Sequence, residues 1–516
     1  MPFIDFNTSF DTDISSYDFT IIGAGAAGIF LSLLLAKKDK KVLVIETGHY
    51  SEDEQRQDLN VILQTGKKLT ASVWGRKRAI GGTTIRWGGQ SLPFDEHVFS
   101  KKDWIKNSGW PISYDDLKEH YREANKFMKI DTLNYREDIF KLFKIKKLFP
   151  DDEVFDQHFS KFASEPNFRK LYAKELDKYV TILYNAVVTT IHANNENVID
   201  KILLTNFNSQ ERWINVNKLI IACGTIESVR LLLASNKSEP QGLGGGSGWL
   251  GKAFMEHPCI TVGSISANEN FKLQSIFNTK IHKGKKFSVR FSLNEDIQEM
   301  QKLVNASLSL MFFYKQESLD PYIGVKKIAQ NKNIKGFSSI LKNMPAYIQT
   351  LYAYSIRKFI YKHKASGRAV LMLEQEPLED SSITLSDEKD KLGMPKVNLD
   401  WRISRVTWET ALYISNYFKK AFEDSTLGTL HLEEYMKSGN DNWENYLSDV
   451  VHHMGGARMS EDSVTGVVDK NLKVWGIENL FVCSCAVFPT SSHSNPTLTL
   501  LALTSRLANH FVEKEK

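Results

Sequence analysis

The sequence has 516 residues, of which 42% are hydrophobic and 25% are charged. Because a domain usually has about 100–200 residues, we expect two intertwined domains or one large elaborated domain. The composition is that of an average soluble protein, and it excludes a disordered chain, a collagen-like fibre and a disulfide scaffold. The net charge of +5 is small for this length and argues against a nucleic-acid-binding protein.

The four cysteines are Cys223, Cys259, Cys483 and Cys485. None belongs to a Cys-x-x-Cys pair, and no Cys/His spacing suits zinc. We therefore expect reduced thiols, no metal site and a cytoplasmic protein. The N-terminal residues carry acids and lack the apolar segment of a signal peptide. No apolar stretch reaches the roughly 18 residues that a membrane span needs.

A βαβ unit is predicted near the N-terminus. Residues 17–22, YDFTII, have the pattern of a buried strand, a glycine-rich turn and an apolar helix follow, and 41–46, KVLVIE, form the next strand. Residues 101–180 are predicted to be mostly helical. Further strands are predicted at 182–193, 201–207 and 218–223, a helix at 226–234, and antiparallel strands within 260–313 and 370–401.

The turn after the first strand has the pattern Gly-x-Gly-x-x-Gly. It is formed by Gly23, Ala24, Gly25, Ala26, Ala27 and Gly28. Such glycines allow a tight turn, the approach of a pyrophosphate and close helix–strand packing, and the helix N-terminus binds phosphate. Glu46 ends the second strand, where a carboxylate can accept both ribose hydroxyls. The pattern predicts a site for FAD or NAD rather than NADP; a merely structural glycine turn is the disfavoured alternative.

A second glycine-rich segment spans residues 80–93, IGGTTIRWGGQSLP. Its glycines and threonines can bring backbone close to a flat ligand. Taken alone, the segment is also compatible with a glycine-rich surface turn.

The C-terminal part contains candidate catalytic residues. His452 and His453 precede a Gly-Gly turn in VHHMGGARM, and Asn495 precedes a proline that favours extended or turn geometry. Thr497 lies in the first turn of an apolar helix. Oxidation of an alcohol needs a base for the hydroxyl proton and a polar group that holds the oxygen, and imidazole suits the base role. For His493 we favour a structural hydrogen-bonding role.

These blocks together resemble the glucose–methanol–choline family of FAD-dependent oxidoreductases, of the bacterial sugar- and pyranose-oxidising type. The resemblance covers most of the chain and rests on GAGAAG with Glu46, GGTTIRWGGQSLP, IIACGTIESVRLLLASN, WLGKAFMEHP, QEPLEDSSITLSDEKDKLGMPKVNLDW and HHMGGARM with NPTLTLLAL. It implies an α/β Rossmann-like FAD-binding domain (1–110, 175–258 and 440–516) interleaved with an α+β substrate domain built on an antiparallel sheet (111–174 and 259–439).

The resemblance also implies roles for individual residues. The family's catalytic histidine lies in a pattern His-x-x-Gly-x-x-Arg-Met, which selects His452 rather than His453 as the base, and Asn495 takes the second catalytic position. Ser484 stands where many members have Asp. Some members bind FAD covalently through a histidine of the glycine loop; residues 80–93 contain no histidine, so we expect non-covalent FAD. The expected cofactor-binding residues are Gly23, Gly25, Ala26, Ala27, Gly28, Glu46, Thr47, Gly82, Thr83, Gly88, Val188, Ala222, Ser484, Asn495 and Thr497.

The expected reaction is oxidation of a CH–OH group of a sugar, glycoside or related polyol to a carbonyl, with hydride passing to the flavin. The electron acceptor (oxygen, a quinone or a carrier) and the oligomeric state are left open. A non-redox, flavin-containing lyase of the same fold is the alternative. The loop at 80–93 and the C-terminal block argue against an NAD-dependent dehydrogenase, and intact His452 and Asn495 argue against an inactive binding protein.

The stretch 321–373 contains ten Lys and Arg residues and no Asp or Glu, with aromatic residues between them. The favoured interpretation is a solvated face of substrate-domain helices. The alternative is a peripheral surface for an anionic membrane or for an anionic, carrier-linked substrate.

Overall fold

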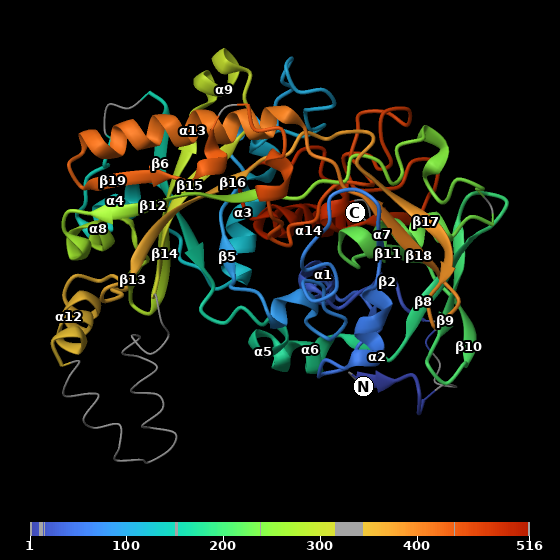
Figure 1. The fold of residues 1–516 in the computed structure, drawn as a ribbon. Helices are drawn as coiled ribbons and strands as arrows, with labels where there is room; N and C mark the ends of the chain where they lie inside the picture. The colour runs from blue at the N-terminus through green and yellow to red at the C-terminus, as the bar shows by residue number, and fades with distance from the viewer. Residues whose placement is uncertain are drawn as a thin grey trace.

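The computed structural model describes residues 3–9, 14, 16–149, 153–237, 239–314, 344–437 and 439–513. Within the basic stretch identified above, residues 321–343 lie outside the described residues. Two large sheets organise the chain, and they lie in different parts of the molecule (Figure 1).

A six-stranded parallel sheet carries the glycine turn. Its strand order is β1 (Phe3–Asp5), β7 (Thr181–Tyr184), β3 (Val42–Glu46), β2 (Phe19–Ile22), β11 (Lys218–Ile221) and β20 (Leu480–Val482). Phe19 stands opposite Val42 on one side and opposite Lys218 on the other. β2 and β3 are buried along their whole length, because helices cover both faces of a parallel sheet and its strands are continuous apolar runs.

The helices around this sheet are α1 (Ala26–Ala36), α3 (Asp115–Phe127), α7 (Thr225–Ala234) and α14 (Pro496–Glu513). α14 packs against both α1 and α3. The C-terminal helix therefore lies directly on the helix that follows the glycine turn (Figure 1).

The second large sheet is antiparallel and has eight strands. Its order is β19 (Gly428–Leu432), β12 (Cys259–Ala267), β16 (Ser366–Leu373), β15 (Ala306–Phe313), β14 (Lys285–Leu293), β6 (Phe155–Phe162) and β5 (Gln90–Ser91), with β13 (Lys280–His282) paired to β14. α13 (Arg405–Asp424) lies across this sheet (Figure 1). Its buried residues include Trp408, Ala411, Ile414, Phe418 and Phe422, the three- and four-residue spacing of a core-facing helical stripe.

Two three-stranded sheets complete the β-structure. β8 (Val187–Ala193), β9 (Ile199–Thr205) and β10 (Glu211–Asn215) form an antiparallel meander, and β17 (Ser382–Lys389), β18 (Pro395–Asp400) and β4 (Leu63–Gln64) form the other sheet. β17 and β18 belong to the segment expected in the substrate domain, yet they lie beside α7 (Figure 1). β5, expected in the cofactor domain, pairs with β6 in the antiparallel sheet.

The remaining helices are short. They are α2 (Glu54–Gln57), α4 (Glu137–Phe143), α5 (Phe168–Leu171), α6 (Ala173–Tyr179), α8 (Asn270–Phe277), α9 (Glu295–Gln301) and α12 (Met344–Ser355). The 3₁₀ turns are η1 (Asp58–Asn60), η2 (Gly82–Ile85), η3 (Glu96–Val98), η4 (Gly245–Ser247), η7 (Glu434–Met436), η8 (Trp443–Tyr446) and η9 (Cys485–Val487). Within the described part of the chain, no helix combines the length and the apolarity needed to cross a bilayer.

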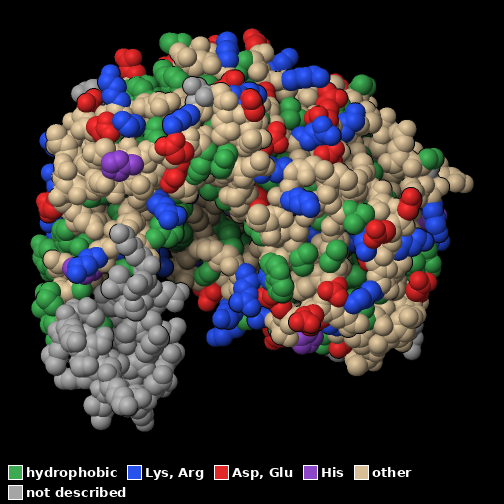
Figure 2. Space-filling view, in the orientation of Figure 1, with side chains coloured by type: hydrophobic (Ala, Val, Ile, Leu, Met, Phe, Trp, Pro, Cys, Tyr) green, Lys and Arg blue, Asp and Glu red, His purple; other side chains and the backbone are tan. Residues whose placement is uncertain are grey.

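The structure adds a strand to the region predicted to be mostly helical. Residues 101–180 contain α3, α4, α5 and α6, but also β6, which pairs with β14 from Phe155 to Lys161. Figure 2 shows that the molecular surface is hollowed between the part that carries the antiparallel sheet and the part that carries α1, α5 and α6.

Candidate active site

The glycine turn between β2 and α1 combines close packing with open space. A Cβ atom on Gly28 would lie 1.9 Å from the carbonyl oxygen of Gly23, and one on Gly23 would lie 2.6 Å from the carbonyl oxygen of Ala222. A Cβ atom on Gly25 would meet none of the described atoms within 4 Å. Gly23 and Gly28 are therefore required by the packing of the chain itself, whereas Gly25 borders space that a ligand can fill.

This open space faces the first turn of α1. Gly25 is the N-cap residue, and among the described residues no side chain caps the helix. The N–H groups at the start of a helix have no intrahelical acceptor, and the helix dipole adds partial positive charge there. The backbone at Ala26 and Ala27 thus fits the pyrophosphate of a dinucleotide.

Glu46 lies beside this turn at the end of β3. Its Oε2 atom accepts a hydrogen bond from the N–H of Ala24 at 2.9 Å, and Oε1 accepts one from Gly48 at 2.8 Å. Burial raises the pKa of this carboxyl group, and the two backbone hydrogen bonds oppose that rise. Each carboxylate oxygen can accept a further bond, so Glu46 fits the ribose hydroxyls, with the half-buried Thr47 next to it.

The glycine-rich segment at 80–93 lies directly on the glycine turn. The N–H of Gly81 donates to the carbonyl of Ala24 at 2.8 Å. A Cβ atom on Gly82 would lie 2.8 Å from the Cα atom of Gly25. Thr83 and Gly88 are exposed in this structure. The two glycine segments therefore form one cradle, with exposed polar backbone along its edge.

The expected cofactor residues gather at one edge of the parallel sheet. The glycine turn follows β2, Glu46 ends β3, and Ala222 follows β11. Ser484 follows β20, and Val188 lies in β8, which comes directly after β7. Ligands of parallel α/β sheets bind outside the carboxyl ends of the strands, and these positions fit a dinucleotide such as FAD.

Ser484 and Thr497 lie where the C-terminal segments reach this edge. The side-chain oxygen of Ser484 accepts the N–H of Ala486 at 3.3 Å, which leaves its hydroxyl hydrogen available as a donor. Thr497 is half-buried in the first turn of α14, two residues after Asn495.

The structure brings His452 and Asn495 together. The Nε2 atom of His452 lies 3.2 Å from the Nδ2 atom of Asn495. His452 comes from the loop before the Gly-Gly turn, and Asn495 directly precedes α14. Because an amide NH₂ group only donates, Nε2 of His452 must be unprotonated to accept this bond.

A second histidine fixes this protonation state. The Nε2 atom of His257 lies 3.0 Å from the carbonyl oxygen of Ser491, so it carries the proton. A neutral His257 then accepts at Nδ1, which lies 2.9 Å from Nδ1 of His452. His452 therefore holds its proton on Nδ1 and presents a lone pair on Nε2. Sequence reasoning missed His257; the buried Glu–His pair of the segment WLGKAFMEHP was the available signal.

Glu256, the other member of that pair, contacts both histidines of the C-terminal motif. Its Oε1 atom accepts the backbone N–H groups of His452 at 2.7 Å, of His257 at 3.0 Å and of Val450 at 3.3 Å. Its Oε2 atom lies 3.5 Å from Nε2 of His453. The side chain of His453 thus points to Glu256, whereas that of His452 points to Asn495.

All three histidines are neutral near pH 7. Burial, together with the neighbouring His257 and His453, lowers the pKa of His452 well below its ordinary value. Burial also lowers the pKa of His257 to about 4 and that of His453 to about 3. Neutral imidazole at His452 is the form that can accept a proton.

Buried polar groups hold the loop that leads to Asn495. Glu374 accepts the N–H of Ser492 through Oε1 at 3.1 Å and the N–H of Asn305 through Oε2 at 2.9 Å. The N–H of Gln375 donates to Oγ of Ser491 at 3.1 Å. These contacts fix the backbone on which the Ser491 carbonyl and Asn495 stand, as a preorganised site requires.

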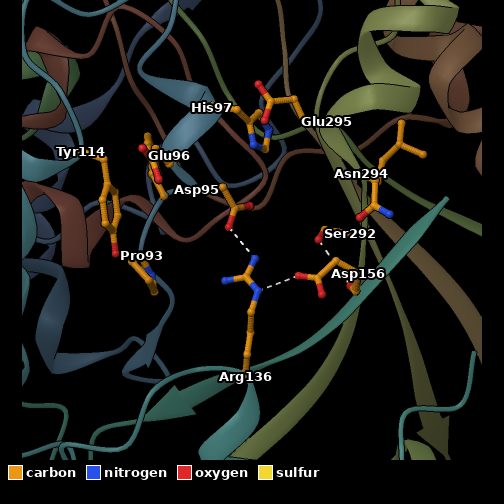
Figure 3. Close-up of a pocket in the computed structure, with 12 residues that line it drawn as sticks. Pro93, Asp95, Glu96, His97, Tyr114, Arg136, Asp156, Ser292, Asn294 and Glu295 are labelled. Carbon is orange, nitrogen blue, oxygen red and sulfur yellow. Dashed lines mark hydrogen bonds and ion pairs between the residues drawn. The ribbon is translucent and has the colours of Figure 1, made fainter. Parts of the chain in front are cut away.

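A pocket of about 360 Å³ is lined mainly by residues 93–97 and 292–295 (Figure 3). Arg136 stands between two carboxylates in it, 2.9 Å from Asp95 and 2.7 Å from Asp156. The other oxygen of Asp95 lies 3.6 Å from Nε2 of His493. Burial would raise the pKa of Asp95, but His493 and Arg136 hold it well below its usual range. His493 therefore faces this ion cluster and takes a structural position.

Comparison with known proteins gives a family match for the C-terminal part of the chain. Residues 377–504 match the family model described as GMC oxidoreductase. The C-terminal quarter of the chain thus matches the GMC oxidoreductases, which the chain resembles. The matched residues include both His452 and Asn495. The protein is an oxidoreductase that resembles this family, whose cofactor is FAD.

Two curated relatives are similar to this chain over much of their length. The fructose dehydrogenase large subunit of Gluconobacter japonicus is 24% identical, over 96% of this chain and 97% of that protein. The 2-methyl-1,2-propanediol dehydrogenase of Mycolicibacterium austroafricanum is 24% identical, over 63% of this chain and 53% of that protein.

Solved structures show the same fold. Pyridoxine 4-oxidase from Mesorbium loti matches with a TM-score of 0.57 at 14% identity, over 96% of this chain and 99% of that chain. A formate oxidase matches with a TM-score of 0.56 at 15% identity, over 98% of this chain and 99% of that chain. The chain thus has the fold of these two oxidases.

Proposed function

We propose that this protein oxidises a CH–OH group of a sugar, glycoside or related polyol to a carbonyl. The observation that carries the proposal is the unprotonated Nε2 atom of His452, which faces Asn495 at 3.2 Å while Nδ1 is bonded to His257. A base and an oxygen-holding donor side by side are what the oxidation of an alcohol requires.

In this proposal, the substrate hydroxyl lies between His452 and Asn495. Nε2 of His452 takes the hydroxyl proton, and Nδ2 of Asn495 donates a hydrogen bond to the oxygen as negative charge develops on it. The start of α14 lies next to Asn495, and the positive end of a helix favours such a charge. His257 keeps His452 in the reactive tautomer throughout.

FAD, when bound, supplies the acceptor for the substrate hydride. We propose that the backbone at Gly25, Ala26 and Ala27 holds its pyrophosphate and that Glu46 and Thr47 hold the ribose. Val188 and Ala222 border the adenosine. The flavin end would meet Gly82, Thr83, Gly88, Ser484, Asn495 and Thr497. Because residues 80–93 contain no histidine, we propose that FAD is bound without a covalent link.

The substrate class rests on the relatives. One is named for fructose, and another for a vicinal diol. Both compounds carry adjacent hydroxyl groups, so we propose a polyhydroxylated substrate for this enzyme as well.

The test is anaerobic reduction of the bound flavin. The purified, FAD-loaded enzyme is mixed with sugars, glycosides, diols and simple alcohols while the visible flavin band is followed. Sugars or glycosides should bleach the band, and the His452→Ala variant should bleach far more slowly. If a fully loaded enzyme is bleached by none of these compounds, the proposal is wrong. Readmitting oxygen then shows whether oxygen reoxidises the flavin.

A further inference from the structure

α12 presents apolar side chains to the outside of the molecule. The helix is anchored on its inner side by Ala346 and Ala353, which are both buried. On its outer side and just beyond its end, Ile348, Leu351 and Ile356 are 60%, 64% and 65% exposed. A surface helix of a globular protein normally shows the reverse arrangement, with its apolar stripe turned to the core. Exposed apolar stripes mark contact surfaces.

Specific contacts hold α12 in place. Phe271 of α8 stacks on Tyr352 at a centroid distance of 6.1 Å and meets Phe359 edge-on at 5.3 Å. The chain after α12 runs beside β13, because the N–H of Ile281 donates to the carbonyl of Lys358 at 2.7 Å. α12 thus stands at the edge of the molecule, next to β13 and α8 (Figure 1).

Basic side chains from two separate segments meet around this helix. Residues 270–294, which include α8 and β13, contain six Lys and Arg residues and no Asp or Glu, and residues 321–373 contain ten and none. Apart from Arg368 on β16, the described exposed members are Lys272, Lys283, Lys286, Arg357, Lys358 and Lys364. We call these six cations together with Met344, Ile348, Leu351, Tyr352 and Ile356 the α12 surface.

We propose that the α12 surface docks on a lipid bilayer that contains anionic lipid. Apolar side chains of the helix enter the boundary between headgroups and acyl chains, and tyrosine is favoured at that depth. The flanking cations lie at the level of the lipid phosphates, where each strengthens binding about fivefold. A second copy of this chain fits poorly, because a symmetric contact would place the two sets of cations opposite each other. The proposal is independent of the substrate.

The first experiment is vesicle sedimentation with the FAD-loaded enzyme. One vesicle preparation is phosphatidylcholine alone, and the other contains about 30% phosphatidylglycerol. The enzyme should sediment with the anionic vesicles, stay in solution with the neutral ones, and be released by about 1 M salt, at which the Debye length is about 3 Å. No binding, or equal binding to both preparations, would overturn the proposal.

Variants then locate the contact. Ile348→Glu with Leu351→Glu should abolish sedimentation, whereas Met300→Glu on α9, where the side chain is 69% exposed, should leave it unchanged. Lys283→Gln with Lys286→Gln should weaken binding about 25-fold at fivefold per charge. The matched control is Lys37→Gln with Lys38→Gln, two exposed lysines at the end of α1. Unchanged flavin reduction in solution shows that each variant is folded.

The same variants also test whether the α12 surface is a contact with a second copy of the protein. If the enzyme is a dimer in solution and the Ile348→Glu, Leu351→Glu variant is a monomer, the α12 surface is a subunit interface and the membrane proposal is wrong. Retained binding of that variant to anionic vesicles would overturn it as well.

Discussion

Glu256 and His453 form a buried neutral pair behind the candidate base, with Oε2 of the carboxyl group 3.5 Å from Nε2 of the imidazole. Burial raises the pKa of Glu256 to about 8 and lowers that of His453 to about 3. At neutral pH the carboxyl group therefore keeps its proton and the imidazole is uncharged, and Oε2 and Nε2 form no hydrogen bond at this separation. The adjacent histidines of the motif thus differ in what they face: His453 faces a buried carboxyl group, and His452 faces the amide of Asn495.

Replacing Glu256 by Gln should change how stability depends on pH. In the unfolded chain Glu ionises near its ordinary pKa of 4.5, whereas folded Glu256 keeps its proton to about pH 8. The free energy of unfolding of the wild type therefore falls as pH rises across this window, by roughly 1 kcal/mol per pH unit from this group. Glu256→Gln should lack this contribution. Denaturant unfolding between about pH 5 and about pH 8 measures the difference, in which the histidine contributions cancel.

The control is Glu256→Ala, which removes the acceptor of three backbone N–H groups and should be destabilised by several kcal/mol at every pH. Parallel pH curves for the wild type and Glu256→Gln would contradict the assignment of the proton.

His452→Ala should slow the reduction of FAD by about 10²–10⁴-fold, the usual contribution of a general base. His453→Ala is the matched control, because its side chain faces Glu256 rather than Asn495. It should lower stability while leaving the reduction rate much closer to that of the wild type. Anaerobic stopped-flow absorbance gives both rates. A larger rate loss in the His453 variant would transfer the base role to that residue.

His257 should act as a positioning residue through the tautomer of His452. His257→Ala removes the acceptor for Nδ1–H of His452, so we expect flavin reduction to slow about 10–100-fold and the pH profile of the rate to shift. His257→Asn offers a carbonyl oxygen as acceptor and should restore much of the rate. The KM for substrate should change little in either variant. Equal rates in the Ala and Asn variants would show that His257 only fills space.

Two glycines of the same turn should respond differently to Ala. Gly28→Ala places a Cβ atom 1.9 Å from the carbonyl oxygen of Gly23 and should prevent correct folding. Gly25 has φ −84°, and its Cβ would meet none of the described atoms within 4 Å, so Gly25→Ala should fold. Its affinity for FAD should fall at least about tenfold, as measured by flavin fluorescence. Unchanged affinity would place the pyrophosphate elsewhere.

Acid precipitation should release all the flavin. Because residues 80–93 contain no histidine, a denatured enzyme should leave its yellow colour in the supernatant, and the intact mass of the protein should equal that of the polypeptide. A yellow pellet with an increased mass would show a covalent link through another residue.

Local patterns predicted the elements around the glycine turn well. The strand expected at 41–46 is β3 (Val42–Glu46), and the helix expected at 226–234 is α7 (Thr225–Ala234). The local sequence of each element, an apolar run for β3 and a helical repeat for α7, is enough to identify it without knowledge of its distant contacts. β6 was missed inside a mostly helical region, because its strand character depends on pairing with β14, far away in sequence.

The candidate site was predictable only in part for the same reason. His452 and Asn495 carry a motif, but His257 joins them only because Met255 and Met454 exchange two backbone hydrogen bonds of 2.8 Å. No local pattern in the segment before Pro258 indicates which distant loop it will meet. The position of β17 and β18 likewise depends on their contacts with α7, which the alternation of polar and apolar residues within these strands does not reveal.

The connectivity of the parallel sheet has a consequence for synthesis of the chain. β11 pairs with β2 from the beginning of the sequence and with β20 from near its end, and Asn495 stands between β20 and the last helix. During translation the glycine turn at residues 23–28 is made before Asn495. A chain interrupted before Asn495 therefore contains the glycine turn and β11 but lacks, in one event, both the amide that faces His452 and the helix α14 that packs on α1.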